Sequence, residues 1–247
     1  MLSYTIQRGA KTGEWKPKTC GLCGKRYTFD KALKFETIFT EKKASKKHKP
    51  IIVGEAVNRY YLSPIKYIDT GKPGVNYKEP ELYKPPKLVV RRTGIGIYAT
   101  LDNSSAYTTQ VVFIFKFKEG LNEPYRPEYF LALLNSRLMF YYYYKKFCEL
   151  EWKSFPYLTQ KTIQQLPLRK INFQNPVEKK LHDSLVRKVT RALESGKKIP
   201  DDLDFEIEDL VMRAYQIPEE YKTHIWDELK KVQRLRAFAL VCALCQM

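Results

Sequence analysis

Residues 87–118 read KLVVRRTGIGIYATLDNSSAYTTQVVFIFKFK. Apolar runs in this stretch, rich in β-branched and aromatic residues, are separated by the turn-forming segments TG and DNSS. β-Branched and aromatic side chains pack well on a pleated sheet, and Gly, Asp, Asn and Ser favour the turns between strands. The stretch therefore predicts an antiparallel meander at the centre of the fold.

On either side of this stretch the pattern is mixed. Short β-type runs occur at Ile51–Val53, Tyr60–Leu62, Ile65–Ile68 and Thr162–Leu168. Helical spacing of apolar residues occurs over 128–147, 176–195, 205–215 and roughly 219–240. The sequence predicts an α+β fold, in which a twisted, mostly antiparallel sheet with a packed helix is followed by a helical spacer. We expect three regions, 1–49, 50–175 and 176–247.

The formal net charge of the 247-residue chain is +17. The excess of Lys and Arg lies in residues 1–199, whereas residues 200–247 hold more acidic than basic side chains. A basic body with a mildly acidic end favours a polyanion as partner of the body and a protein as partner of the end. A lysine-rich surface that serves solubility alone is the alternative.

The chain has no apolar run long enough to cross a bilayer, and its first residues, MLSYTIQRGAKTGEW, do not have the pattern of a signal peptide. A cytoplasmic protein with reduced thiols is expected. Cys20 and Cys23 resemble a zinc knuckle, and Cys242 and Cys245 have the same spacing. Because the last two also fit an apolar, buried tail, a four-cysteine zinc site and a metal-free chain both stay open, and no cofactor is predicted.

Motifs of catalysis are absent from the sequence. It has no glycine-rich nucleotide loop, no acidic or Asn residue before a Pro-Pro-aromatic triplet, and no Gly-x-Ser-x-Gly elbow. Pro200-Asp201 with Glu228-Leu229-Lys230 loosely fits the metal site of a nuclease, but this Glu-x-Lys lies in a predicted helix and the pattern recurs elsewhere in the chain. We therefore predict a binding module without a catalytic centre.

Candidate DNA contacts lie where basic and polar residues accompany the predicted strands. Lys87, Arg91 and Arg92 flank the first strand of the 87–118 stretch, and Tyr107, Thr108, Thr109 and Gln110 begin the last. Arginine can bind the guanine edge with two hydrogen bonds, and lysine binds phosphates. Lys46 and Lys47 belong to a basic cluster at 42–49. Ordinary strand residues and a solvated face are the alternative for each of these positions.

In their order along the chain, four segments resemble the TaqI-like C-terminal specificity domain of restriction–modification DNA methyltransferases, which is similar to type I specificity subunits. These are Ile52–Tyr60 (IVGEAVNRY), Leu88–Gly94 with Tyr107–Gln110, Tyr129–Tyr141 with its core LLNSRL, and Phe155-Pro156 with Leu166-Pro167-Leu168. The first segment adds Arg59 to the candidate DNA contacts.

The resemblance implies that residues 50–175 are a target recognition domain that reads a short site in double-stranded DNA. A separate DNA methyltransferase subunit or domain, with or without a nuclease, would be the partner, and residues 176–247 would dock it. Two other functions remain open. Basic and aromatic composition also suits an RNA-binding module, and the cysteine pairs also suit a zinc-containing subunit for protein–protein assembly.

Overall fold

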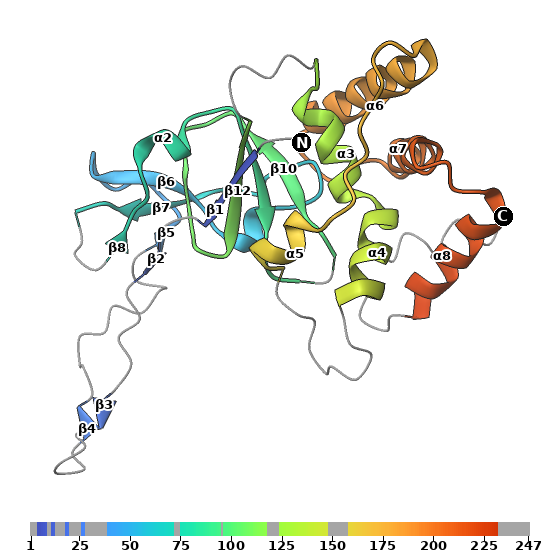
Figure 1. Ribbon diagram of the computed structural model, residues 1–247. Coiled ribbons are helices and arrows are strands. Elements are labelled where there is room, and N and C mark those ends of the chain that lie inside the picture. The colour runs from blue at the N-terminus through green and yellow to red at the C-terminus, as the bar shows by residue number, and fades with distance from the viewer. Residues whose placement is uncertain are drawn as a thin grey trace.

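A computed structural model describes residues 4–8, 11–12, 18–19, 26–27, 39–71, 75–94, 96–117, 124–147 and 158–231. Two sheets lie together on one side of the molecule and the longer helices on the other (Figure 1). The architecture is α+β, as the sequence predicts. The four cysteines considered for zinc, together with Cys148 and Phe155-Pro156, lie outside the described residues.

The first sheet has the strand order β1-β12-β9-β10, and its neighbouring strands are all antiparallel. Its strands are β1 (Tyr4–Arg8), β9 (Lys87–Arg91), β10 (Ala99–Asp102) and β12 (Val112–Phe117). The second sheet has the order β11-β6-β7-β5, in which β11 runs parallel to β6 and the other pairs are antiparallel. Its strands are β5 (Phe39–Thr40), β6 (His48–Ile52), β7 (Lys66–Asp69) and β11 (Tyr107–Thr108).

Two short strand pairs and a series of helices complete the described part of the chain. The pairs are β2 (Lys11–Thr12) with β8 (Val75–Asn76), and β3 (Lys18–Thr19) with β4 (Arg26–Tyr27). The short helices are η1 (Gly54–Ala56), α2 (Pro80–Tyr83) and α5 (Gln160–Gln164). The longer ones are α3 (Pro127–Asn135), α4 (Arg137–Phe147), α6 (Pro176–Glu194), α7 (Asp201–Ala214) and α8 (Glu219–Lys231).

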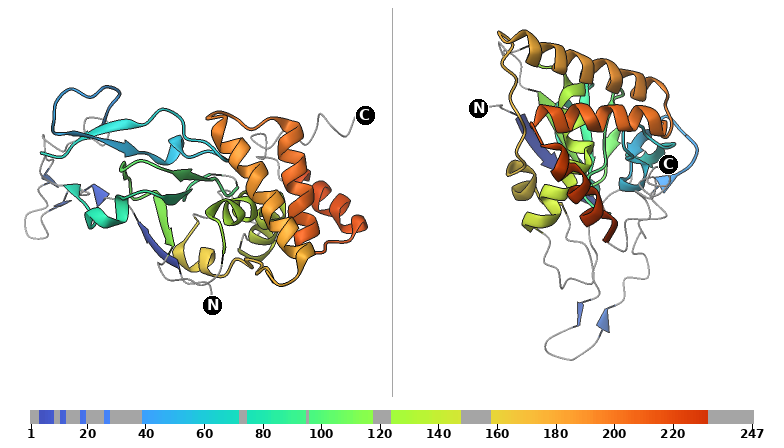
Figure 2. Two further views of the ribbon diagram at one scale, coloured as in Figure 1. Left: turned by 90° about the horizontal axis from the view of Figure 1, so that it is seen from above. Right: turned by 90° about the vertical axis from the view of Figure 1, so that its right-hand side faces the viewer.

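The apolar runs of β9 and β12 are continuous because both faces of the first sheet are covered. Leu88 and Val90 pack with Phe113 and Phe115 in the core that also holds α3. Val89, one residue away, faces Ile52 and Val57 on the side of the second sheet. Side chains alternate between the two faces of a strand, so a strand buried on both faces reads as a nearly continuous apolar run. The layers are therefore second sheet, first sheet and helices, which the view from above also shows (Figure 2).

The helices after residue 175 share this core. Leu185 and Val189 of α6, Ile207 of α7 and Leu229 of α8 belong to the same buried cluster as Leu88 of β9. In Figure 2, α6 and α7 run side by side over one end of the molecule. The division of the chain into domains stays a prediction, but in the structure the helical region is packed on the sheet rather than held apart from it.

The predicted meander is wrong in its strand order. β9 and β10 form the expected hairpin, but β12 returns to the far side of β9 instead of pairing with β10. The last run of the stretch also divides, because β11 leaves the first sheet and joins β6 of the second. Tyr60–Leu62 is not a strand either: Tyr60 has φ of 68° and donates its backbone N–H to the carbonyl of Ala99 at 3.0 Å.

Two predictions for the 129–168 region also need correction. The single helix expected after residue 127 is divided at Ser136, whose hydroxyl donates to the carbonyl of Leu133 at 2.8 Å and accepts from the N–H of Met139 at 3.1 Å. The β-like run Thr162–Leu168 instead contains the end of α5, because Thr159 and Thr162 form a reciprocal capping box at its start. Helices 176–195 and 205–215 are confirmed as α6 and α7, with Gly196 at φ of 58° after α6.

Candidate nucleic-acid interface

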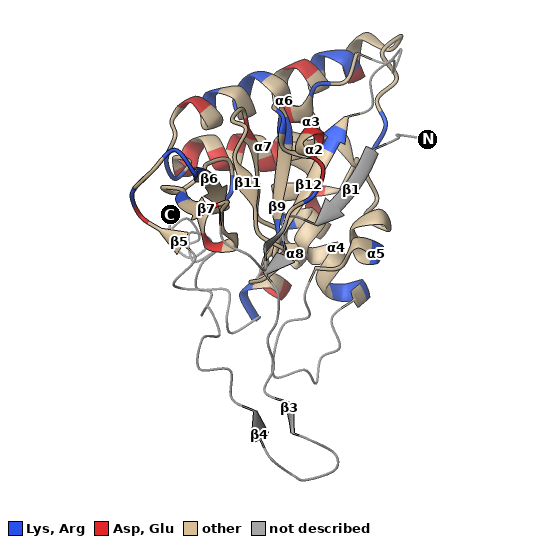
Figure 3. Ribbon diagram, turned by 90° about the vertical axis from the view of Figure 1, so that its left-hand side faces the viewer, with Lys and Arg blue, Asp and Glu red and all other residues tan. Residues whose placement is uncertain are grey.

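The segment 41–49, which follows β5 and includes the first two residues of β6, presents the densest group of exposed lysines on the second sheet. Its five lysines are all exposed: Lys42, Lys43, Lys46, Lys47 and Lys49. The backbone of this lysine segment is anchored, because the carbonyl of Lys47 accepts hydrogen bonds from the N–H and the hydroxyl of Thr70, at 3.1 and 2.9 Å. Figure 3 shows basic residues in the turn that leads into β6. Among the described residues, no carboxylate forms an ion pair with these lysines.

Lys87 occupies a different environment. Its side chain is fully buried, and its ammonium group forms an ion pair with Asp102 at 2.5 Å. The same group donates to the carbonyls of Tyr83 and Ser104, at 2.8 and 2.5 Å. Burial lowers the pKa of Lys87, and Asp102 opposes that effect. These contacts join the ends of β9 and β10 to α2, so Lys87 has a structural role in this conformation.

Arg59 is also occupied by protein groups. Its guanidinium donates to Asp204 at 2.7 and 3.0 Å, to Glu208 at 3.1 Å and to the carbonyl of Asn135 at 3.1 Å. The side chain is 13% exposed, and the two carboxylates are almost fully buried. A bidentate arginine–carboxylate pair of this kind has a strict geometry and leaves few donors for another ligand.

Arg137 reaches the same two carboxylates from the start of α4. Its guanidinium lies 2.7 Å from Asp204 and 3.1 Å from Glu208, and its backbone N–H donates to both oxygens of Glu208 at 3.0 Å. Glu208 therefore satisfies an amide at the N-terminus of α4 that has no partner within the helix. We call Arg59, Arg137, Asp204 and Glu208 the arginine–carboxylate cluster.

The two carboxylates of the cluster have pKa shifts of opposite sign. Burial raises the pKa of Glu208, and the nearby Asp204 charge adds to this rise. Burial alone would also raise the pKa of Asp204, but the charges of Arg59 and Arg137 lower it overall. Close carboxylates commonly separate in this way, since one is held ionised and the other becomes easier to protonate.

Arg91 and Arg92 lie where β9 ends. Arg91 is half-buried: its guanidinium lies over the ring of Tyr98, 5.7 Å from the centroid, and makes a 3.4 Å contact with the hydroxyl of Thr93. The Arg92 guanidinium donates to the carbonyl of Gln110 at 3.1 Å and lies over the ring of Phe113. Arg92 thus fixes the turn that contains Gln110, whereas Arg91 is held only by weaker contacts among those the structure describes.

The four residues at 107–110 do not form one exposed edge. Tyr107 packs against the rings of Tyr77 and Tyr83, with centroids 5.0 and 4.6 Å away. Thr108 and Thr109 are buried, and the Thr109 N–H donates to the carbonyl of Ile52 at 3.1 Å. Gln110 is half-buried in the turn before β12. The candidate DNA contacts are therefore spread over separate places, and the structure does not bring them together as one surface.

Residues 49–168 match the family model of the TaqI-like C-terminal specificity domain. The chain contains a specificity domain of this family. The match begins in β6 and ends after α5, so it covers most of the described part of both sheets, together with α3 and α4. No curated protein matches the chain significantly.

The motif residues through which the chain resembles this family have structural roles in the specificity domain. In LLNSRL, the side-chain oxygen of Asn135 accepts a hydrogen bond from the N–H of Ala99, and its amide nitrogen donates to the carbonyl of Ala99, both at 2.9 Å. This pair of hydrogen bonds covers part of the outer edge of β10. Ser136 divides α3 from α4, and Arg137 joins the arginine–carboxylate cluster. In the first segment, Arg59 joins the same cluster and Gly54 lies against Val111.

Asp204 and Glu208 lie after the matched region and belong to no motif recognised in the sequence. They are four positions apart on α7, on the side that also buries Leu203, Ile207 and Val211. Charged residues at buried positions of an amphipathic helix need partners. Two acidic residues at i and i+4 on the apolar side of a helix therefore predict that cationic side chains from elsewhere in the chain are buried against them.

Across the described residues there is no group of three or more His, Cys, Asp or Glu side chains that could hold a metal ion. None of the described helices has the length and apolar character that crossing a membrane requires.

Proposed function

We propose that this chain recognises a short sequence in double-stranded DNA and directs a separate restriction–modification methyltransferase to it, without a catalytic centre of its own. The observation that carries the proposal is the specificity domain at residues 49–168, because its family is a recognition module of restriction–modification systems. The strongly basic charge of the chain agrees with a polyanionic partner.

The environment of each cation suggests which residues contact DNA. Lys46 and Lys47 are exposed, and we assign them to phosphates, where they set affinity and its dependence on salt. Arg91 and Gln110, both half-buried beside the β9 end, are proposed to reach base edges, with Arg92 holding the turn between them. Arg59, Lys87, Thr108 and Thr109 are left out of the proposed surface because their polar groups face the protein interior.

The proposal is tested by selection from a randomised duplex DNA pool at moderate salt, followed by sequencing of the retained DNA. An enriched short motif is the expected result. Retention of all sequences alike, or no retention at low salt, would overturn sequence recognition by the chain. Single-stranded RNA and duplex DNA of equal length are then compared at matched salt, and a preference for RNA would replace the proposal with an RNA-binding function.

A charge-reversed pair checks the phosphate assignment. Lys46→Glu with Lys47→Glu is expected to weaken binding to all duplexes by at least about tenfold and to reduce the salt dependence of binding. Lys179→Glu with Lys180→Glu, an equal charge change at adjacent exposed residues of α6, is the matched control. Equal losses in the two pairs would show that net charge, rather than the lysine segment, determines affinity.

A further inference from the structure

The apolar seam between α6 and α7 extends beyond the part that the two helices bury. On α6, Val177, Leu181, Leu185, Val189 and Ala192 follow one another at helical spacing. The last three are buried in the core, Leu181 is partly buried, and Val177 is 73% exposed. Since α7 is antiparallel to α6 and joined to it by a short link, its C-terminal end lies beside the exposed end of the seam.

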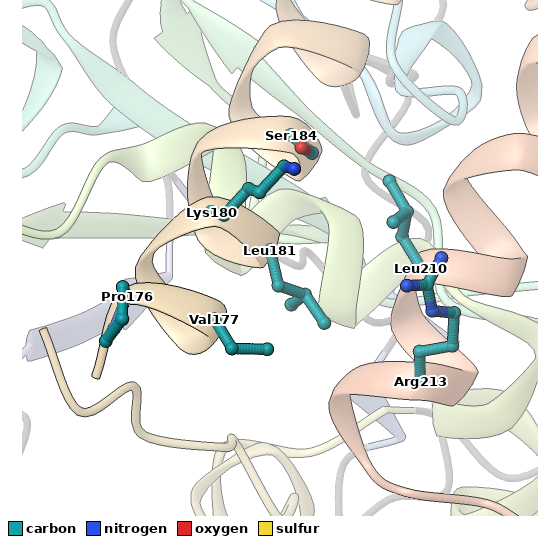
Figure 4. A pocket seen from close by; sticks show the side chains of 7 residues that line it. All are labelled: Pro176, Val177, Lys180, Leu181, Ser184, Leu210 and Arg213. Atoms are coloured by element: carbon teal, nitrogen blue, oxygen red, sulfur yellow. The ribbon is translucent and has the colours of Figure 1, made fainter.

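A hollow of about 490 Å³ lies at this exposed end. It is lined by Pro176, Val177, Lys180, Leu181, Ser184, Leu210 and Arg213, and we call it the α6–α7 groove. Figure 4 shows Val177 and Leu181 directed from α6 toward α7, with Leu210 and Arg213 on the opposite side.

Cations are present on both sides of the groove. Lys180 stands on α6, and Arg213 on α7 has one loose ion pair, 3.8 Å from Asp209. Lys179, Arg187 and Arg191 add further exposed cations along α6, interspersed with fewer acidic residues, as Figure 3 shows for the helix as a whole. An apolar floor between cations is complementary to an apolar ridge that is flanked by carboxylates.

We propose that the α6–α7 groove binds an acidic amphipathic helix of the protein partner. The inference rests on the proposed function in one respect, namely that the chain works beside a separate catalytic partner. Leu, Ile, Phe or Met side chains at helical spacing would cover Val177, Leu181 and Leu210, and Asp or Glu beside them would pair with Lys180 and Arg213.

Other occupants fit this groove less well. The DNA backbone offers phosphates to the cations but would leave Val177 and Leu181 against charged oxygens. A second copy of the chain bound through the same face would place Lys180 and Arg213 of one groove against those of the other, because a two-fold interface pairs a surface with itself. An acidic helix satisfies both the apolar floor and the cations on its two sides.

The test uses the full chain and a displayed library of helical peptides of about 20 residues. The library fixes an apolar stripe at i, i+3 or i+4, and i+7, and randomises the other positions among Lys, Arg, Asp, Glu, Gln and Ser. Selection on the native chain is followed by removal of every peptide that also binds Val177→Asp. We expect the surviving peptides to carry Asp or Glu beside the apolar stripe.

Val177→Asp suits the counter-selection because Val177 is mostly exposed in the first turn of α6, where an acidic residue is compatible with the helix. The best peptide should bind at least about tenfold less tightly to Val177→Asp and Lys180→Glu, and within about twofold of native to Lys179→Glu. Lys179 has the same charge and neighbourhood in sequence, but it does not line the groove.

Three results would overturn the inference. These are an absence of peptides that distinguish native from Val177→Asp, an enrichment of basic peptides, and an equal loss with Lys179→Glu and Lys180→Glu. The DNA selection on the same native protein is independent of these readouts. A chain that enriches a DNA motif but no acidic peptide would therefore keep its proposed function and lose only this groove as a docking site.

Discussion

Arg59 donates two hydrogen bonds to the carboxylate of Asp204, at 3.0 and 2.7 Å, across 145 residues of sequence. Arg59 lies inside the matched specificity domain, and Asp204 lies on α7, outside it. Arg137, from a second motif of the domain, binds the same carboxylate at 2.7 Å. Two motif arginines thus attach α7 to the matched domain, which agrees with the apolar core that the two regions share.

Removal of Arg59 is expected to destabilise the fold. In Arg59→Ala, Asp204 and Glu208 stay buried with only Arg137 to balance them, and breaking a buried ion pair commonly costs about 3–5 kcal/mol. Urea unfolding of the full chain measures the change. Arg126→Ala is the control, because Arg126 is 63% exposed and its contact with Glu128 is 3.4 Å long, so a change below about 1 kcal/mol is expected. Similar losses in both variants would show that the cluster adds no stability.

The residue pattern predicted which segments are strands better than it predicted how the strands pair. The runs in β9 and β12 are apolar because both faces of the first sheet are covered, and that pattern is visible locally. The strand order β12-β9-β10 is not visible in the local sequence. The alternation of apolar and polar residues indicates which face each side chain lies on, but not which strand is the neighbour. Likewise, the β-type residues of Thr162–Leu168 predicted a strand, whereas the capping box at Thr159 begins the helix α5 there.

The candidate site shows the same limit for individual cations. The sequence identified Lys46, Lys87 and Arg59 alike, because residue type and position in a motif are all that it provides. The structure separates them by partners distant in the chain, since Arg59 meets α7 and Lys87 meets Asp102 across a hairpin. One pattern in the sequence does indicate that some cations are buried. It is the pair Asp204 and Glu208 on the apolar face of a helix.

The buried pair of Lys87 and Asp102 gives a second prediction. Lys87→Met keeps the length and apolar stem of the side chain but leaves a buried carboxylate without its cation, so a loss of about 3 kcal/mol or more is expected in urea unfolding. Lys87→Met with Asp102→Asn removes both charges and retains the acceptor that binds the Ser104 N–H at 2.9 Å. The double variant should recover at least half of the loss. If it is less stable than Lys87→Met alone, the charges are not the cause.

Gly54 is tightly packed against Val111. A Cβ atom at Gly54 would lie 2.9 Å from Cγ2 of Val111, closer than ordinary contacts allow. Gly54→Ala is therefore expected to lower the free energy of unfolding by about 1–3 kcal/mol. Val111→Ala removes the clashing methyl groups, so the combination of Gly54→Ala with Val111→Ala should cost less than the sum of the two single changes. Additive losses, measured by urea unfolding, would count against the contact.

Glu228 gives a prediction for acid stability. Hydrogen bonds from Lys145, on α4, and from Lys231 lower its pKa from the ordinary value of 4.5 to about 2. A lowered pKa in the folded state means that the stabilising contribution is present above about pH 4.5 and is lost as the pH falls toward about 2. The difference in thermal midpoint between the native chain and Glu228→Gln should therefore be largest near neutral pH and shrink over that range. Glu220→Gln, at an exposed position of α8, is the control and should show a smaller difference throughout.

Arg91 and Arg92 are adjacent in sequence but should respond differently to substitution. Arg91→Ala is expected to weaken binding to the selected DNA motif by about 1–3 kcal/mol and binding to random duplex by less, because its half-buried guanidinium is proposed to read a base. Arg92→Ala removes the 3.1 Å bond to the carbonyl of Gln110, so it should also lower the thermal midpoint of the free protein. Binding assays on both DNAs and thermal unfolding separate the two effects. An equal loss on specific and random DNA for Arg91→Ala would assign this arginine to phosphate contact and leave the base-reading surface elsewhere on the domain.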